Sequence, residues 1–225
     1  MISDKTGIID IIAISELRQG MIFRRQTFLE KLKERMSFEK TGAKLYEALL
    51  KKYHAIEVES KKRKGLQYEA SDLPPLFQLE KFYHEEKNHY EMTRKLLVSM
   101  GANIDSKTHD DVCSMVESAW VQMIEDPRTS FVQSLDIILQ AELVDNASWE
   151  ILIELAESLN MDEAIEIFEH ALEEENIHLA YVRAWVSQLY LNGSVEEDPY
   201  AMSEEELMDD TTDEVFYIKK KASYI

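Results

Sequence analysis

Residues 142–153 read Glu-Leu-Val-Asp-Asn-Ala-Ser-Trp-Glu-Ile-Leu-Ile, and residues 39–50 read Glu-Lys-Thr-Gly-Ala-Lys-Leu-Tyr-Glu-Ala-Leu-Leu. The two stretches align without a gap, with glutamate first and an aromatic residue eighth in both. Residues 84–89 (His-Glu-Glu-Lys-Asn-His) align in the same way on residues 173–178 (Glu-Glu-Glu-Asn-Ile-His). The chain therefore contains an internal repeat, which predicts two similar helical hairpins related by pseudo-two-fold symmetry.

Apolar residues recur at steps of three and four around each stretch, which is the pattern of a helix with one buried face. Glycine and proline are scarce, with 6 and 4 in 225 residues, so the chain has few turns. We therefore expect an all-α protein with four long helices. They are expected from about Arg25 to His54, from after Asp72 to Gly101 with Pro74 and Pro75 in the first turn, from after Pro127 to about Leu159, and from after Asp162 to about Asn192.

These helices are expected to form one four-helix bundle over residues 25–192, built from two hairpins. A long crossover joins the second and third helices and is expected to contain a short extra helix at about residues 109–124. Residues 1–24 form an N-terminal extension with little pattern, and residues 193–225 form an acidic C-terminal tail.

The composition excludes several classes of protein. Apolar residues make up 45% and charged residues 31% of the chain, and no apolar stretch reaches the ~20 residues that span a bilayer. The formal net charge of −19 disfavours nucleic acid and anionic membranes as partners. Cys113 is the only cysteine, so no internal disulfide forms, and the N-terminus lacks a signal-peptide pattern. We therefore expect a cytoplasmic protein.

Acidic side chains interrupt the apolar face of every long helix. Glu39 lies within the face of the first helix, and Glu142 and Asp145 lie within that of the third. The second and fourth faces each contain the pattern Glu-x-x-His, formed by Glu86 with His89 and by Glu175 with His178. A buried carboxylate needs a positive partner, and we expect no lysine or arginine in these faces. Two divalent metal ions would balance the four glutamates.

The spacing favours particular glutamates as ligands. In an antiparallel hairpin, residues equidistant from the turn lie at equal height, and the midpoint between Glu142 and the Glu175/His178 pair is about residue 159, where the helical pattern breaks. The rival Glu150 would place the turn inside the next helix. In the first hairpin both Glu39 and Glu47 satisfy the rule, so only the apolar face and the match to Glu142 favour Glu39. Glu47 stays an alternative.

These residues resemble the ferritin-like superfamily, and the stretches around Glu39 and Glu142 resemble an uncharacterised bacterial ferritin-like domain family, over about residues 28–190. The resemblance implies a ligand set of Glu39, Glu86, His89, Glu142, Glu175 and His178. It also implies that the acid before each Glu-x-x-His, Glu85 or Glu174, accepts a hydrogen bond from a ligand histidine on another helix. Asp145 is expected beside the ligands.

The resemblance implies a centre of two iron ions that oxidises Fe(II) or reduces O2 or H2O2, in the manner of a ferroxidase or peroxidase. Two manganese ions or a mixed iron and manganese pair are alternatives. Other readings are a manganese catalase-like dismutase, a di-iron oxygenase and a non-enzymatic iron-binding module.

Several features of related proteins are not expected here. One cysteine cannot supply a rubredoxin-type iron site, and no haem-binding motif is found, so neither group is expected. The tail does not resemble the fifth helix of a storage ferritin. The oligomeric state, a homodimer included, stays open.

Overall fold

The computed structural model describes residues 5–62, 73–104 and 111–191, with side chains described for residues 18–58, 73–104 and 116–191. The described residues contain five helices and no strand, which confirms the predicted all-α class. The helices are α1 (Lys5–Lys62), α2 (Leu76–Ser99), α3 (Asp111–Glu125), α4 (Phe131–Glu157) and α5 (Asp162–Leu191). The acidic tail, residues 193–225, lies outside the described part.

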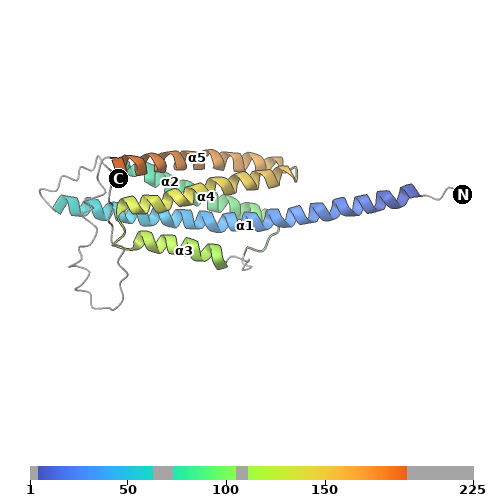
Figure 1. The fold of residues 1–225 in the computed structure, drawn as a ribbon, viewed down its shortest axis with the longest axis horizontal. Helices are drawn as coiled ribbons and strands as arrows, with labels where there is room; N and C mark the ends of the chain where they lie inside the picture. The colour runs from blue at the N-terminus through green and yellow to red at the C-terminus, as the bar shows by residue number, and fades with distance from the viewer. Residues whose placement is uncertain (1–4, 63–72, 105–110, 192–225) are drawn as a thin grey trace, which may run out of the picture.

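The helices form two hairpins that pack against each other, α1 with α2 and α4 with α5 (Figure 1). α1 also packs along α4, and α2 touches α5, which closes a four-helix bundle. The short helix α3, in the connection between the hairpins, lies against α1 and α4. The arrangement agrees with the expected bundle and crossover helix.

The helix ends follow recognisable signals. Pro75 is the N-cap of α2, so Pro74 and Pro75 precede the first turn and were wrongly expected within it. Gly101 ends α2 with a φ of 72°, a conformation that favours glycine. Ser130 caps α4 through a capping box with Gln133. Asn160, with a φ of 53°, lies in the short turn between α4 and α5, where the equal-height argument requires a turn.

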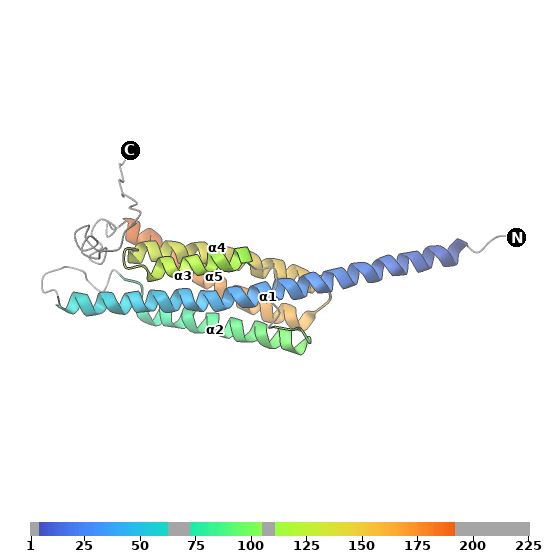
Figure 2. The same cartoon turned by 90° about the horizontal axis from the view of Figure 1, so that it is seen from below.

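The first helix is longer than expected. We expected residues 25–54, but α1 runs from Lys5 to Lys62 and projects well beyond the bundle at its N-terminal end (Figure 2). The sequence between these ends contains no proline, so nothing interrupts the helix. Much of the N-terminal extension is therefore a continuation of α1.

The apolar core consists of two clusters at different heights in the bundle. The first cluster packs around Tyr46, Phe82, Leu135 and Trp185. The second packs around Phe28, Leu97, Trp149 and Phe168. On each of the four long helices a short segment without apolar core residues separates the two clusters, and that segment carries the acidic residues and histidines singled out by the sequence. Among the described helices, none has a stretch apolar and long enough to cross a membrane.

Candidate metal centre

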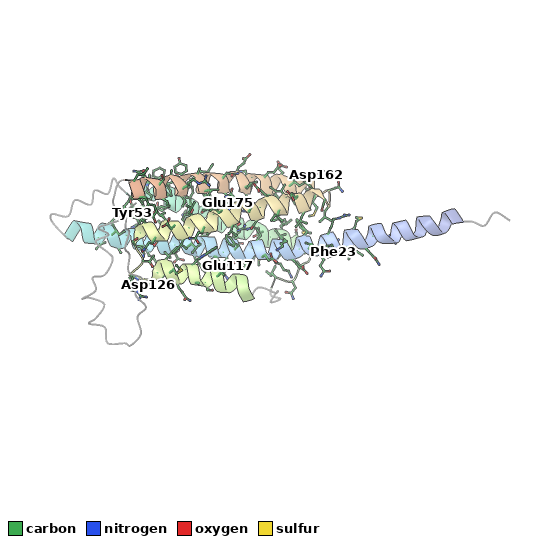
Figure 3. All side chains as sticks on the ribbon, viewed as in Figure 1. Phe23, Tyr53, Glu117, Asp126, Asp162 and Glu175 are labelled. Atoms are coloured by element: carbon green, nitrogen blue, oxygen red, sulfur yellow. The ribbon has the colours of Figure 1, made fainter. Side chains whose placement is uncertain are left out.

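The structure brings the six predicted ligands together in one layer between the apolar clusters. Each helix of the bundle contributes to this layer, and Glu175 on α5 lies near the middle of the bundle's length (Figure 3). The six residues are each at most 3% exposed: Glu39, Glu86, His89, Glu142, Glu175 and His178. So complete a burial of four carboxylates demands a positive counterpart.

Three of the glutamates converge on the ring of His178. Its Nδ1 lies 3.1 Å from Glu175 Oε2, 3.6 Å from Glu86 Oε1 and 3.8 Å from Glu142 Oε2. The four residues offer one nitrogen and three oxygens that all lie within 4.8 Å of one another. We call this group the His178 position. Such a spacing allows one cation to contact all four.

A second group forms around the His89 ring, and we call it the His89 position. The Nδ1 atom of His89 lies 2.8 Å from Glu175 Oε1 and 3.6 Å from Glu39 Oε2. These three residues again offer atoms within 4.8 Å of one another. Glu175 therefore belongs to both groups, with one oxygen facing each histidine, and could bridge two ions.

The outer nitrogen of each histidine faces a carboxylate from the opposite hairpin. His89 Nε2 lies 2.8 Å from Glu174 Oε2, and His178 Nε2 lies 3.1 Å from Glu85 Oε2. When Nε2 carries the ring proton it donates to the carboxylate, which leaves Nδ1 facing the interior of the layer. Glu85 and Glu174 thus lie where the sequence analysis expects them. Lys81 also donates to Glu85, at 2.5 Å.

A buried arginine also lies in this layer, so the expectation that the faces hold no lysine or arginine was wrong. Arg35 is 3% exposed, and its Nε lies 2.8 Å from Glu39 Oε1. Its Nη1 lies 2.8 Å from Asp145 Oδ1 and donates to the Asp145 carbonyl at 3.2 Å. The guanidinium also lies over Phe38 and Trp149, at 4.5 and 5.2 Å from the ring centroids. Arg35 lies one turn before Glu39 on α1, and its long side chain reaches into the bundle, so its guanidinium is buried in the layer.

The remaining polar atoms fit a pair of divalent cations. Arg35 contacts both Glu39 and Asp145, so one positive charge faces the carboxylates of four glutamates and one aspartate, and a negative excess remains. Several buried atoms of the layer make no hydrogen bond of regular geometry: both carboxylate oxygens of Glu39 and Glu175, one oxygen each of Glu86 and Glu142, and Nδ1 of His89 and His178. Buried polar atoms are seldom left without partners, and carboxylate oxygens with imidazole nitrogens are a donor set that could hold divalent metal ions.

Without metal, the histidines take up the positive charge. Burial opposes the charged form of His89, but hydrogen bonds to Glu174 and two further glutamates outweigh it and raise the pKa of His89 well above its usual range. Burial opposes a charge on His178 as well, yet Glu175 outweighs it and raises the pKa of His178. Burial and the nearby Glu175 raise the pKa of Glu86 to about 8. Protons thus balance the layer in the metal-free chain.

The rival candidates lie outside the layer. Glu47 is exposed on α1 and pairs with Lys51 at 3.0 Å, and Glu150 is exposed on α4. The histidines that do not belong to a Glu-x-x-His pattern and that the structure describes, His54, His84 and His170, also lie on the surface. His109 lies outside the described residues.

Two further residues of the layer were not identified from sequence. Gly42 lies against Glu86, because a Cβ at this position would lie 2.0 Å from Glu86 Oε2. Tyr46, the aromatic residue at the eighth position of the first repeat, donates its hydroxyl hydrogen to Glu142 Oε1 at 2.5 Å. Glycine inside a helix costs about 1 kcal/mol relative to alanine, so its presence within an apolar face is the one signal that could have identified Gly42.

Comparison with known families gives one match. A family model described as "Domain of unknown function (DUF892)" matches residues 41–190, about two thirds of the chain. The chain belongs to the DUF892 family. Comparisons with curated proteins and with solved structures gave no match. Five of the six predicted ligands fall within the DUF892 match, and Glu39 lies just before it, as does Arg35.

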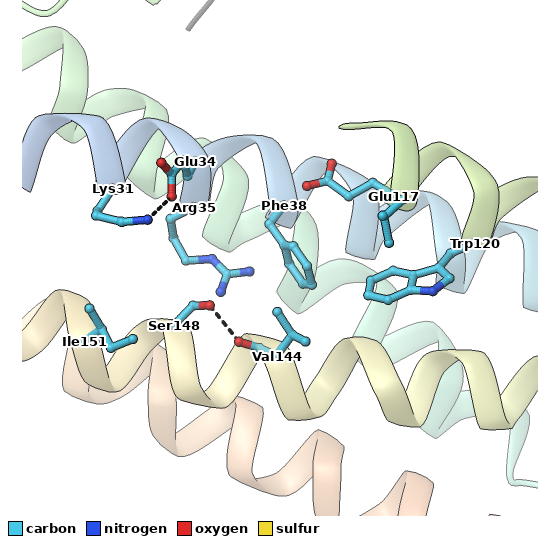
Figure 4. A pocket seen from close by; sticks show the side chains of 10 residues that line it. Lys31, Glu34, Arg35, Phe38, Glu117, Trp120, Val144, Ser148 and Ile151 are labelled. Atoms are coloured by element: carbon cyan, nitrogen blue, oxygen red, sulfur yellow. Dashed lines mark hydrogen bonds and ion pairs between the residues drawn. The ribbon is translucent and has the colours of Figure 1, made fainter. Parts of the chain in front are cut away.

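The DUF892 chain also has a cavity beside the layer. It has a volume of about 380 Å³ and lies between α1, α3 and α4 (Figure 4). Its lining is mostly apolar and includes Phe38, Trp120 and Val144. Arg35 borders the cavity and also binds Glu39, so it stands between the cavity and the charged layer.

Proposed function

We propose that the chain is a ferritin-like protein that binds two divalent metal ions in the buried layer, iron in preference to manganese, and oxidises Fe(II) with O2 or H2O2. The observation that carries this proposal is the set of buried oxygens and Nδ1 atoms that face one another without a hydrogen bond of regular geometry. Two divalent cations would give these atoms partners and balance four carboxylates. The duplicated Glu and Glu-x-x-His pattern supports a ferritin-like relationship within the DUF892 family.

The side chains of the layer have distinct tasks in this proposal. Glu175 would contribute a ligand oxygen at both positions, Glu39 would contribute one at the His89 position, and Glu142 would contribute one at the His178 position. Glu85 and Glu174 fix the histidine rings so that Nδ1 faces inward. Bound iron would supply the electrons that reduce O2 or H2O2, since carboxylate and imidazole ligands stabilise Fe(III).

Metal analysis after anaerobic loading with Fe(II) tests the proposal. We expect about two iron ions per chain and consumption of O2 or H2O2 on mixing. Glu142→Ala should lower the iron content, whereas Glu150→Ala, an exposed neighbour two turns along the same helix, should not. Absence of bound iron, or iron held equally well by the Glu142→Ala variant, would refute the proposal. Analysis of protein purified from its own host distinguishes iron from manganese.

The cavity favours a second candidate function, a di-iron oxygenase that acts on a small apolar substrate. A small apolar molecule bound against Phe38, Trp120 and Val144 would be separated from the charged layer by Arg35. Narrowing the cavity with Val144→Trp would then slow substrate oxidation but leave simple Fe(II) oxidation intact. Leu143→Trp, on the adjacent exposed position outside the cavity, is the control. Equal rates for both variants would exclude this second function.

A further inference from the structure

The two positions of the layer differ in what already binds their glutamates. At the His178 position, Glu142 accepts a hydrogen bond from the neutral hydroxyl of Tyr46. At the His89 position, Glu39 is bound by the guanidinium of Arg35, with Nε at 2.8 Å. A neutral donor leaves the full negative charge of its glutamate available to a metal ion, whereas the guanidinium of Arg35, shared between Glu39 and Asp145, already offsets part of the charge of Glu39.

The internal repeat shows that this difference is not imposed by the fold. When the alignment of residues 39–50 on 142–153 is extended by four residues towards the N-terminus, Arg35 corresponds to Ile138. Ile138 is fully buried in the apolar core. The partner of Arg35, Asp145, corresponds to Gly42. The two residues that form the buried ion pair are thus both absent from the symmetry-related place.

The ion pair lowers the attraction of the His89 position for a cation in two ways. A metal ion bound to Glu39 would lie close to the positive charge of Arg35, and like charges in a buried, weakly screened site repel strongly. Asp145 offsets part of this repulsion through its contact with Nη1. In addition, three residues gather at the His89 position and four at the His178 position. Glu39 and Glu175 also form a group with Glu86 and Asp145, but Arg35 already binds Asp145 in that group.

We infer that the two metal positions have unequal affinities, that the His178 position fills first, and that Arg35 is the residue that weakens the second. This inference rests on the proposed two-metal centre. It goes beyond that proposal because two equivalent positions would bind their ions with equal affinity and in no fixed order. Arg35 acts here as a positioning residue for Glu39, since it binds the ligand and not the metal.

Titration with Mn²⁺ tests the inference on the whole chain. Calorimetry should resolve two dissociation constants that differ by at least about tenfold, a ratio that one moderate charge interaction can produce. Electron paramagnetic resonance with one equivalent of Mn²⁺ should show isolated ions, because the first position fills before the second. A spin-coupled pair of ions at one equivalent would overturn the inference. Absence of any tight Mn²⁺ site would instead refute the proposed function.

Two variants then distinguish the electrostatic effect of Arg35 on the second position from a general disruption of the layer. Asp145→Asn leaves the charge of Arg35 without its offset, so the second dissociation constant should rise by about tenfold. Arg35→Met combined with Asp145→Asn removes both charges and keeps an apolar side chain under Phe38 and Trp149, so the second constant should fall below the wild-type value. The first constant should change by less than about threefold in both variants, which also reports that the bundle is folded.

The test is decisive because the second dissociation constant is expected to rise in Asp145→Asn and to fall in the double variant. If Asp145 were itself a metal ligand, both variants would bind the second ion more weakly than wild type. If the layer were merely disrupted, the first constant would weaken too. Either result would overturn the role assigned to Arg35.

Discussion

The apolar clusters at the two ends of the bundle and the charged layer between them are built on the same four helices, but they are stabilised in opposite ways. The clusters gain free energy when Phe168, Leu135 and their neighbours leave water, at about 1.5 to 3 kcal/mol for each large side chain, whatever is bound. The charged layer buries four glutamates that repel one another until cations or protons balance them. The ends of the bundle are thus stabilised by apolar burial, and the stability of the middle depends on the positive charges or protons that balance its glutamates.

The largest expected effect is the loss of both metal positions in Glu175→Ala. Glu175 offers one oxygen to each histidine and belongs to both ligand groups, so its removal takes a ligand from each. Mn²⁺ content after desalting should drop from about two ions per chain to none. Glu173→Ala, which removes an exposed carboxylate two residues earlier on α5, should keep full content. Retention of both ions by Glu175→Ala would show that the layer is not the metal site.

Glu39→Ala should remove a single ion, that of the His89 position. The structure buries Glu39 and exposes Glu47, so Glu47→Ala should leave the metal content unchanged. The same desalting assay measures both variants. If Glu47→Ala lost metal and Glu39→Ala kept it, the ligand assignment on α1 would be wrong by two turns.

Phe168→Ala should destabilise the protein by about 3 to 5 kcal/mol, with and without metal alike. Phe168 is fully buried between Trp149 and Phe28, at centroid distances of 5.5 and 6.2 Å. Urea denaturation of metal-free and Mn²⁺-loaded protein measures the change, and Ile167→Ala on the adjacent exposed position is the control. A loss of stability confined to the loaded protein would mean that the apolar end and the charged layer are not separate.

Gly42→Ala should weaken metal binding although it improves helix propensity. The added Cβ would meet Glu86 Oε2 at 2.0 Å and force that carboxylate away. Gly20→Ala, on the same helix with nothing within 4 Å, should only stabilise α1, by about 0.5 to 1 kcal/mol. Equal Mn²⁺ affinity in both variants, by calorimetry, would contradict the assigned role of Gly42.

The smallest effect concerns pH in the metal-free chain. The folded chain keeps a proton on Glu86 up to a pKa of about 8, and the unfolded chain releases it near the ordinary pKa of 4.5, so stability should fall as the pH rises through this window. The raised pKa values of His89 and His178 act in the same direction. Glu86→Gln should flatten the decline seen by urea denaturation, and Glu80→Gln, exposed on the same helix, should not. An unchanged slope in Glu86→Gln would contradict the raised pKa.

Much of the layer follows from local sequence pattern. A helix face is defined by residue spacing, so Glu86 and His89, three residues apart, must share one face in any helix that contains them. The short turn at Asn160 then places Glu142 level with the pair on α5. Such relations depend only on helix geometry and on the length of the turn.

The sequence by itself therefore determined the all-α class, the two hairpins and the acidic and histidine residues of the layer, because these follow from periodicity within single helices. Only the tertiary structure decided that Arg35 turns its guanidinium inward to Glu39 and Asp145, and that Gly42 makes room for Glu86. Both arrangements depend on a side chain from another helix, Asp145 in one case and Glu86 in the other. A long flexible side chain at the edge of an apolar face can point to water or to the core, and only the neighbouring helix determines which.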